Sequence, residues 1–405
     1  MSARMLGMEL ELFLTKDGAA IGPVYWKGIV ERAVARGCTR IDEAYTGFPM
    51  GASWQTGQFV LDNNCTVVEL ITLPRASLDE TMDGLRKLLE FFTSLVPELE
   101  LHWSSQFEQP NEDEYWRRTI SSGLYGAVRK QKWRHWTLMN SLAFQPAIDL
   151  YADEITHVLR VLFLTSPVFV CAQEGNNRWG KEHSPRLEIW KSVFCDGGQR
   201  TGFPQREITS LTDYVENLLA LPAFVIFEDG RAEQLTFFES KTVSAGDVMF
   251  AEVPAQRVLN VPDTDDMNGK ELQCKDVRVR GDLASFYSLS LPFWNARLVF
   301  DTGQDGLVED TAAIREAIEG AKKLYVEIRH IGTPRNLTEL ENIYGDFLKL
   351  VENARELDEK ISAIINWQEA EEESRLAIRD GKPGVKSREV FKLLQSFELL
   401  SGAKL

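Results

Sequence analysis

The chain has 405 residues, of which 44% are hydrophobic and 10% aromatic, so it can bury a large core and is not disordered as a whole. Length alone predicts two to three domains, or one large catalytic domain with helical additions. Its 45 Lys and Arg residues against 61 Asp and Glu residues give a formal net charge of −16. That charge argues against general nucleic-acid binding, while a local basic pocket for small anions stays open.

The N-terminal residues and the cysteines indicate a cytoplasmic protein. No apolar stretch long enough for a signal peptide precedes Glu9 and Glu11, so we expect no export. The longest apolar region, 157–172, is interrupted by Arg160 and Pro167 and is too short for a membrane span. The cysteines are odd in number and form no CxxC pair, which predicts reduced thiols. They are Cys38, Cys65, Cys171, Cys195 and Cys274.

The first third of the chain predicts two strands and a helix. Residues 6–14 alternate as a half-buried strand does, and residues 58–72 predict a second strand with a bulge or turn at 62–64. Ser77 and Glu80 form a capping box ahead of a helix. On the first strand Met8, Leu10 and Leu12 share one face, and Glu9, Glu11 and Phe13 share the other.

The middle of the chain predicts further strands and helices in alternation. A strand at about 136–145 precedes a helix from Asp153 to Leu164 that stops before Pro167. A second helix, 211–219, begins at Ser210. Strands are then expected at 223–227 and 276–286.

After about residue 310 the sequence predicts only helices, at 311–329, 337–379 and 387–399, with Thr338 and Glu341 capping the second. We therefore expect a catalytic domain at 1–310 and a helical extension at 311–405 packed on it. Because the strands alternate, an α+β fold with a mostly antiparallel sheet and one polar face is favoured over a parallel doubly wound sheet. No GxGxxG or GxxxxGK[ST] follows a strand, so neither a Rossmann site nor a P-loop is indicated.

Acidic residues on the predicted strands are candidate cation ligands. Glu9 and Glu11 share a face about 7 Å apart, a spacing that allows carboxylates to ligate hard cations, although a plain solvent-facing strand gives the same pattern. Glu69 is the lone acid in a Val-Val-Glu-Leu-Ile stretch, so it needs a cation or an Arg as partner. A salt-bridged edge residue is the alternative for Glu69, and a simple turn residue for Asp62.

Basic residues in two segments suit the recognition of carboxylate or phosphate groups. Arg186 follows a proline turn, and Arg278 and Arg280 share one face of a predicted strand. An ion-pair ladder across the sheet is the alternative explanation. His135 opens the predicted strand at 136, where a hydrogen-bonded surface histidine is the commoner interpretation.

Five segments, taken in order over about residues 6–305, resemble the glutamate-cysteine ligase and carboxylate-amine ligase family, the plant-type ligases above all. GMELELFL at 7–14 is similar to the family's opening acidic strand, and LDNNCTVVELIT at 61–72 to its second one. The more specific segments are SPRLEIW at 184–190, GFPQREITSLTDYVENLLALPAFVI at 202–226 and RVRGDLASFYSLSLPFWNARLVFD at 278–301.

The resemblance implies an ATP-dependent ligase on a saddle-shaped antiparallel sheet related to that of glutamine synthetase, with helices on one face. Such an enzyme activates a carboxylate, here the γ-carboxylate of glutamate, as an acyl phosphate and joins it to an amine, by default that of cysteine. Carried over by position, the resemblance implies that Mg²⁺ or Mn²⁺ is held by Glu9, Glu11, Glu69 and Asp62. It implies that substrate and intermediate are bound by Arg186 and Arg280. It also implies that ATP is bound by Arg186 and Arg278.

The chain departs from the family pattern at a few positions, which leaves the substrate pair open. Arg278 stands where the family has an acid, the spacing from Asp62 to Glu69 is one residue longer, and Met139 and Ala143 replace polar groups. A ligase acting on another amine or a peptide, and a catalytically silent member that binds ligands or regulates a partner, are the alternatives. We expect small amino-acid substrates and neither nucleic acid nor membrane as partner, and the oligomeric state is left open.

Overall fold

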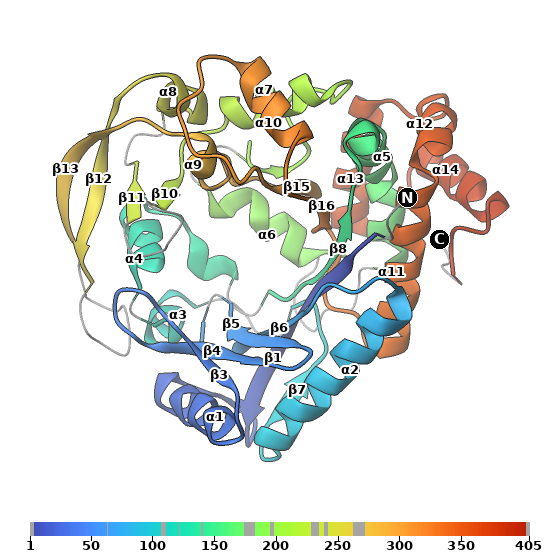
Figure 1. The fold of residues 1–405 in the computed structure, drawn as a ribbon. Coiled ribbons are helices and arrows are strands. Elements are labelled where there is room, and N and C mark those ends of the chain that lie inside the picture. The colour runs from blue at the N-terminus through green and yellow to red at the C-terminus, as the bar shows by residue number, and fades with distance from the viewer. Residues whose placement is uncertain are drawn as a thin grey trace.

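The computed structural model describes residues 4–62, 64–106, 111–120, 122–138, 141–173, 183–194, 198–227, 235–238, 242–261 and 272–401. Its main element is a ten-stranded sheet in the order β15-β16-β8-β1-β6-β5-β4-β3, with β2 and β7 also paired to β1 (Figure 1). All recorded pairings in this sheet are antiparallel, as the alternating strands predict. The strands are β1 (Leu6–Lys16), β2 (Ala19–Ala20), β3 (Thr39–Asp42), β4 (Pro49–Trp54), β5 (Gly57–Leu61), β6 (Val67–Thr72), β7 (Glu100–His102), β8 (Phe144–Asp149), β15 (Ala296–Asp301) and β16 (Lys323–Ile328).

One face of the sheet is apolar and carries the largest hydrophobic core. Met8, Leu10 and Leu12 of β1 are fully buried on it, as the alternation predicts. Helices α2 (Leu78–Leu95), α5 (Ile155–Gln173) and α11 (Leu337–Glu352) cover this face. The Ser77 hydroxyl accepts a hydrogen bond from the Glu80 N–H at 3.3 Å, so the predicted start of α2 at the Ser77 cap is confirmed.

A smaller antiparallel sheet and short helices lie over the polar face. This second sheet has the order β10-β11-β12-β13, and Figure 1 places β12 and β13 at the edge of the molecule opposite α12 and α14. The strands are β10 (Val225–Phe227), β11 (Leu235–Phe237), β12 (Val253–Asn260) and β13 (Gln273–Val279), and β9 (Thr201–Gly202) pairs in parallel with β14 (Phe293–Trp294). The remaining helices are α1 (Pro23–Ala35), α3 (Glu112–Arg118), α4 (Gly123–Lys130), α6 (Pro185–Val193), α7 (Leu211–Ala220), α8 (Ala245–Phe250), α9 (Leu283–Ser290), α10 (Thr311–Glu319), α12 (Ala354–Ser362), α13 (Trp367–Asp380) and α14 (Val385–Ser396), with one-turn 3₁₀ helices η1 (His135–Leu138) and η2 (Ala152–Glu154).

The structure corrects the helical prediction after residue 310. Instead of one helix over 311–329, α10 ends at Glu319, and β16 follows and pairs with β15 and β8. The main sheet therefore takes a strand from beyond residue 310, where the sequence predicted that the catalytic domain ends. The second predicted helical stretch begins with α11, whose cap is Asn336 and not Thr338, and the Asn336 side chain accepts from the Glu339 N–H.

Three further boundaries differ from the prediction. Residues 58–72 form two strands, β5 and β6, in place of one, and the chain turns between them where a bulge or turn was predicted. The strand expected at 136–145 begins only at Phe144, after η1. The strand expected at 276–286 ends at Val279, and α9 begins at Leu283 behind the Asp282 cap.

Helix α5 runs through Pro167 to Gln173, so the predicted stop before this proline is wrong. An internal proline removes a backbone hydrogen bond at a cost of about 3 kcal/mol. Val168, Phe169 and Val170 just beyond it are at most 1% exposed, and α5 packs on α13, so burial of this turn outweighs that cost. With Ala152–Ala172 as its span and a mean hydropathy of 1.7, this segment is long and apolar enough to cross a membrane, but 78% of its most apolar window is buried inside the protein, as in a core helix.

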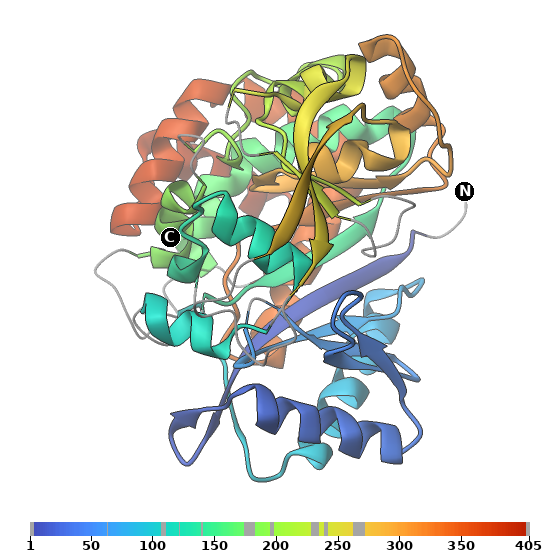
Figure 2. The same cartoon turned by 90° about the vertical axis from the view of Figure 1, so that its left-hand side faces the viewer.

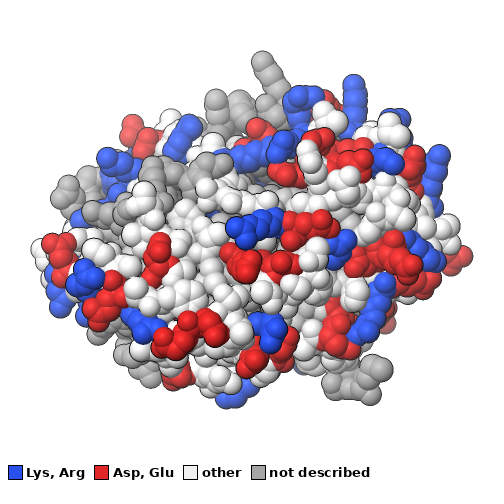
Figure 3. All heavy atoms as spheres, turned by 90° about the horizontal axis from the view of Figure 1, so that it is seen from above, with Lys and Arg blue, Asp and Glu red and all other residues white. Residues whose placement is uncertain are grey.

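The described cysteines form no disulfide, and the charged residues of the surface are mixed in sign. Cys38, Cys65, Cys171 and Cys274 are free, while Cys195, like Met139, lies outside the described residues. Figure 3 shows Lys and Arg interspersed with Asp and Glu over the described residues of one face, without one continuous basic patch there.

Tyr344 on α11 ties the helical layer to two strands, which gives a stability test. Its buried hydroxyl lies 2.8 Å from each of the carbonyl oxygens of Gly7 and Ala147. We expect Tyr344→Phe to lower the free energy of unfolding by about 1–2 kcal/mol, because a buried carbonyl loses its donor. Urea denaturation measures this, with Tyr25→Phe, which removes a surface hydroxyl bonded to Glu98, as a control expected to change it by less than about 0.5 kcal/mol.

Candidate functional site

The polar face of the main sheet gathers the four acidic residues that the sequence singles out. Glu11 on β1 lies directly opposite Glu69 on β6 in the strand register. Glu9 lies two residues before Glu11 on β1 and therefore on the same face. Asp62 comes from the turn between β5 and β6. One carboxylate oxygen each from Glu11, Asp62 and Glu69 lie within 4.8 Å of one another. We call Glu9, Glu11, Asp62 and Glu69 the acidic cluster.

Glu11 is the most firmly held member of the acidic cluster and is only 6% exposed. Its Oε2 accepts a hydrogen bond from the Ala143 N–H at 2.7 Å, and its Oε1 accepts one from Gln145 Nε2 at 3.0 Å. The Thr333 hydroxyl donates to its main-chain carbonyl at 2.8 Å. The carboxylate therefore has one fixed orientation on the sheet.

Burial, together with the neighbouring carboxylates, raises the pKa values of Glu9, Glu11 and Glu69. Burial and the Glu327 carboxylate raise the pKa of Glu9 to about 7. Burial and the Asp62 carboxylate raise the pKa of Glu11 to about 8. Burial and the neighbouring Glu9 carboxylate raise the pKa of Glu69 well above its usual range. A cation among them would stabilise the ionised carboxylates, because a nearby positive charge lowers the pKa of a carboxyl group.

Beside the acidic cluster lies a group of charges that sequence reasoning missed. Arg297 on β15 donates to Glu327 on β16 at 2.9 Å, and Arg329 donates to both Glu327 and the Gln145 amide oxygen. Burial acts to raise the pKa of Glu327, but the two guanidinium groups outweigh it and hold that pKa below its usual value. Gln145 therefore links this ion-paired group to Glu11.

Arg186, which the sequence suggests as an anion-binding residue, lies close to Arg329. It lies on α6, is 2% exposed, and donates from Nη1 to the Arg329 carbonyl at 2.9 Å. Its guanidinium lies 5.4 Å from the centre of the Trp190 ring. Its positive charge also opposes the rise in the pKa of Glu11, so it lies near enough to act on the cluster.

Arg280 and Arg278 take other positions. Arg280 donates to the carbonyl oxygens of Met249 at 3.2 Å and Val308 at 2.9 Å, and it pairs with Glu309. Arg278 is a surface residue beside Glu252. In the described part of the chain, all the contacts given for these two arginines hold β13 to its neighbours and none reaches the acidic cluster. The predicted catalytic role of Arg280 and ATP contact of Arg278 therefore receive no support from their positions.

His135 is not the surface histidine that the sequence favoured. It is half-buried in η1, where Nδ1 lies 2.6 Å from the Tyr115 hydroxyl. Burial lowers the pKa of His135 to about 4, so its ring is neutral at pH 7. The neighbouring Tyr125 hydroxyl donates to the Asp62 carbonyl, so this aromatic group supports the turn that carries Asp62.

A cavity of about 780 Å³ adjoins the acidic cluster on the polar face. Its lining includes Glu9 of the acidic cluster and the nearby Gln145 and Glu327. Further along the sheet it includes Asp149, Tyr325 and Lys323. A cavity of this size falls within the range of small-molecule sites. A reactant could therefore lie beside the cluster.

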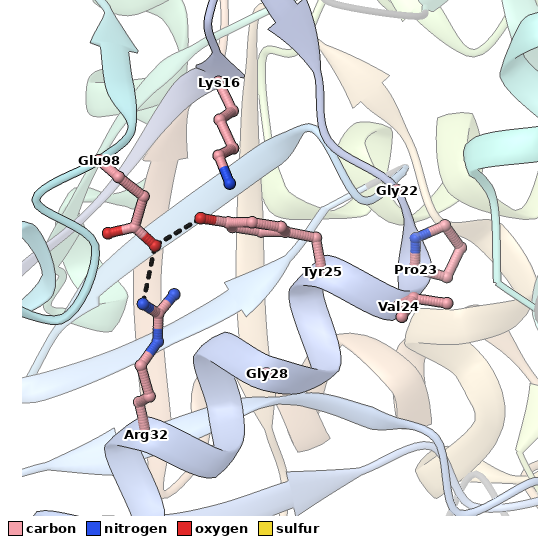
Figure 4. A pocket seen from close by; sticks show the side chains of 8 residues that line it. All are labelled: Lys16, Gly22, Pro23, Val24, Tyr25, Gly28, Arg32 and Glu98. Carbon is pink, nitrogen blue, oxygen red and sulfur yellow. Dashed lines mark hydrogen bonds and ion pairs between the residues drawn. The ribbon is translucent and has the colours of Figure 1, made fainter.

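A second hollow, of about 750 Å³, lies over α1 and is open to solvent (Figure 4). Its charged groups satisfy one another: Glu98 accepts from the Tyr25 hydroxyl and from Arg32 at 2.7 Å, and Lys16 lies over the Tyr25 ring. These bonds from Tyr25 and Arg32 lower the pKa of Glu98 to about 2. The hollow is thus a paired surface feature, and the acidic cluster is the better candidate site.

The donor set of the acidic cluster fits a hard divalent cation. Its ligand atoms are all carboxylate oxygens, the type that Mg²⁺ and Mn²⁺ take in proteins, and no thiolate or imidazole stands among the described residues of the cluster. Three carboxylate oxygens within 4.8 Å are close enough to share one ion.

Comparison with known proteins gives distant structural likenesses. No protein-family model matches the chain, and no curated protein matches it in sequence. It is similar to a bifunctional glutathione synthetase from Pasteurella multocida, at 12% identity and a TM-score of 0.43, over 98% of this chain but only 44% of that one. It is also similar to the glutamate-cysteine ligase of Francisella tularensis in complex with AMP, at 11% identity and a TM-score of 0.40, over 100% and 96% of the two chains. A complex of the ubiquitin-like protein Pup with its ligase PafA matches at 11% identity and a TM-score of 0.24, over 99% of this chain and 76% of that one.

The raised carboxylate pKa values predict a pH dependence of stability. Since the pKa values of Glu9 and Glu11 rise from 4.5 to about 7 and about 8 on folding, the stability they contribute is complete below pH 4.5 and is lost as pH rises through 7 to 8. His330 and His135, whose pKa values burial lowers to about 4, change the stability only below pH 6.5. In EDTA, we expect Tm to fall between pH 6.5 and 9.

The variant Glu11→Gln and added Mg²⁺ are the controls for this scan. Both should flatten the fall in Tm, the variant by removing one titrating group and the cation by favouring the ionised carboxylates. An equal slope in the wild type and in Glu11→Gln would contradict the assignment of the fall to the acidic cluster.

Proposed function

We propose that the protein is an ATP-dependent carboxylate-amine ligase, which activates a carboxylate as an acyl phosphate and joins it to an amine. One observation carries the proposal: a cluster of carboxylates on the open face of an antiparallel sheet lies beside buried arginines. The cluster is Glu9, Glu11, Asp62 and Glu69, and the arginines are Arg186, Arg297 and Arg329. Phosphoryl transfer to a carboxylate needs groups of both kinds, because negative charge accumulates on the phosphate and on the acceptor oxygens.

The acidic cluster is the proposed binding site for Mg²⁺ or Mn²⁺. When bound, such an ion compensates the charge of the ATP phosphates. Glu11, held by the Ala143 N–H and Gln145, keeps a fixed donor orientation, and Glu69 faces it from the next strand. Gln145 and Arg329 connect this site to Glu327 and so fix the distance between carboxylates and guanidinium groups.

Arg186 and Arg329 are the proposed anion-binding residues of the reaction. Both are at least nine-tenths buried, so their charges act in a medium where electrostatic interactions are stronger than in water. A guanidinium can orient a carboxylate and then stabilise the oxyanion that forms when the amine attacks. Arg278 and Arg280 are left out of this machinery because their contacts lie elsewhere.

The proposed carboxylate donor is glutamate through its γ-carboxylate, and the proposed acceptor is a small amine, with cysteine as the first to test. The cavity of about 780 Å³ beside Glu9 has room for an amino acid. We also propose a saddle-shaped sheet of the glutamine synthetase-related kind, and a cytoplasmic enzyme without nucleic-acid or membrane partners.

An assay of ADP release tests the reaction class and then the substrates. With Mg-ATP and glutamate, hydroxylamine should trap the acyl phosphate as a hydroxamate whatever the natural amine is. Pairs of the twenty amino acids then identify the acceptor by ADP formation. A catalytically silent binding protein would release no ADP in either assay. A ligase that uses another amine would form the hydroxamate, but it would release no ADP when cysteine is the only amine supplied.

Binding of Mg-ATP is a separate readout. At 100 times its dissociation constant, a ligand of the folded state adds about 2.7 kcal/mol of stability. A thermal shift with Mg-ATP, and none with ATP in EDTA, would agree with a cation-dependent nucleotide site. Equal shifts with and without the cation would argue against it.

The variant Glu69→Gln tests the cation-binding role directly. It keeps the shape of the side chain and removes one of the crowded charges, so we expect ADP release to fall by about 100-fold or more while Tm is unchanged or higher. A structural salt-bridge residue behaves in the opposite way, since loss of one buried partner costs about 3–5 kcal/mol. Parallel measurement of ADP release and Tm distinguishes the two roles.

Glu341→Gln is the matched control for this substitution. Glu341 makes a surface ion pair with Arg86 at 2.7 Å, and such pairs contribute about 0–1 kcal/mol. It should leave both ADP release and Tm nearly unchanged. Retained turnover in Glu69→Gln together with a large loss of stability would refute the metal-ligand role of Glu69.

A further inference from the structure

Asp62 differs from the other members of the acidic cluster in how its main chain is held. Glu9, Glu11 and Glu69 lie within strands, where the backbone pairing of β1 with β6 fixes each of them. Asp62 lies just beyond the end of β5, and its N–H donates to the Val67 carbonyl at 3.2 Å. The position of the Asp62 carboxylate therefore depends on contacts that the strand ladder does not supply.

Helix α4 supplies a contact to this turn from outside the main sheet. The Tyr125 hydroxyl on α4 donates to the main-chain carbonyl of Asp62. Burial raises the pKa of the Tyr125 hydroxyl, and the Asp62 and Glu69 carboxylates add to that rise, so the oxygen keeps its proton at pH 7 and remains a donor. Val67 and Tyr125 thus hold the main chain of Asp62 at its N–H and at its carbonyl.

Helix α4 is itself held at its start and along one side. The Glu43 carboxylate accepts from the Gly123 N–H at 3.2 Å, and α4 packs against β11 of the second sheet (Figure 1). Gly126 lies so close to Leu272 that a Cβ at this position would stand 2.6 Å from the leucine side chain. Ala127 is fully buried in the hydrophobic cluster of the second sheet. The Tyr125 hydroxyl is therefore presented by a helix that is fixed to the rest of the fold.

Aromatic packing connects the Tyr125 ring to helix α3, which holds the same turn. The rings of Tyr125 and His135 have their centres 5.9 Å apart, and His135 Nδ1 lies 2.6 Å from the hydroxyl of Tyr115 on α3. At the end of α3 the Arg118 carbonyl accepts from the Cys65 N–H at 3.1 Å. Helices α3 and α4 thus support the turn at two places.

We propose that Tyr125 is a positioning residue for the divalent cation of the acidic cluster, acting through the main chain of Asp62. Carboxylate oxygens of Glu11, Asp62 and Glu69 lie within 4.8 Å of one another, and a cation site tolerates errors of only about 0.2 Å in its ligand distances. Loss of a hydrogen bond that orients a metal ligand weakens metal binding by about 10- to 100-fold. This role of Tyr125 rests on the proposed function, because it concerns the cation that this function requires.

The variant Tyr125→Phe removes the hydroxyl and keeps the ring. The dissociation constant of Mn²⁺ is measured on the whole protein from the electron paramagnetic resonance signal of free Mn²⁺, a readout that needs no turnover. We expect Mn²⁺ to bind about 10-fold more weakly to the variant. In assays of ADP release, KM for Mg²⁺ should rise by a similar factor, while kcat at saturating Mg²⁺ stays near that of the wild type.

A double-mutant cycle with Asp62→Asn shows whether Tyr125 acts through Asp62. In the Asp62→Asn background, Tyr125→Phe should have no further effect on the affinity for Mn²⁺. Tyr344→Phe is the matched control, since it also removes a buried hydroxyl that donates to main-chain carbonyls, those of Gly7 and Ala147. It should lower Tm but leave the affinity for Mn²⁺ unchanged.

If Tyr125→Phe does not fold, Glu43→Gln tests the same path from the start of α4. Glu43 accepts main-chain N–H groups at both carboxylate oxygens, from Gly123 at Oε1 and from Tyr45 at Oε2. An amide has only one such oxygen, so the start of α4 loosens and Mn²⁺ should bind about 3-fold more weakly. This loss should also vanish in the Asp62→Asn background.

The remaining outcomes contradict the positioning role or separate it from the proposed function. Equal Mn²⁺ affinities in the wild type and Tyr125→Phe would overturn the role and leave the ligase standing. A loss of affinity that persists in the Asp62→Asn background would also overturn it, because Tyr125 would then act on the cation by another route. Tyr125-dependent Mn²⁺ binding without ADP release or hydroxamate formation would leave the role standing and refute the ligase. A wild type that binds no Mn²⁺ would overturn both.

Discussion

The repulsion among four crowded carboxylates is the constraint around which the polar face of the sheet is arranged. Glu11 and Glu69 are fixed opposite each other by the register of β1 and β6, so neither can move away without breaking backbone pairing. A main-chain N–H and the Gln145 amide hold Glu11 in place, and three arginines on neighbouring elements balance part of the charge. The fold keeps these groups close despite a cost, which is typical of a site that binds an oppositely charged ligand.

The acidic cluster could be predicted from the sequence because period-two alternation survives folding. In β1 the apolar residues define one face, so Glu9 and Glu11 had to share the other. Glu69 was visible as the lone acid of an apolar strand. What alternation does not specify is register: that Glu69 faces Glu11, and that the turn residue Asp62 reaches both, depends on the hairpin of β5 and β6.

The basic half of the site was missed for a local reason. Residues 323–329 alternate too, with Tyr325, Glu327 and Arg329 on the polar face, but they follow an amphipathic helix in a charged region, and a six-residue strand there gives a weak signal. Gln145 was missed because the strand was placed several residues too early. Arg280 shows the limit of strand phase, which gives a face but not which part of the molecule that face meets.

The order of strands in the main sheet has a consequence for how the protein folds. β1 lies between β6 and β8, and β8 in turn needs β16, so neighbouring strands come from residues 6, 67, 144 and 323 onward. Such long separations give a high contact order and slow folding, because large loops must close before the pairings form. During synthesis β1 and β6 can pair early. Glu327 and Arg329, which lie beside their acidic face in the folded protein, are added only after some 250 further residues. Early charge repulsion on the β1–β6 pair is thus built into the chain order, and divalent cations should accelerate refolding of the protein.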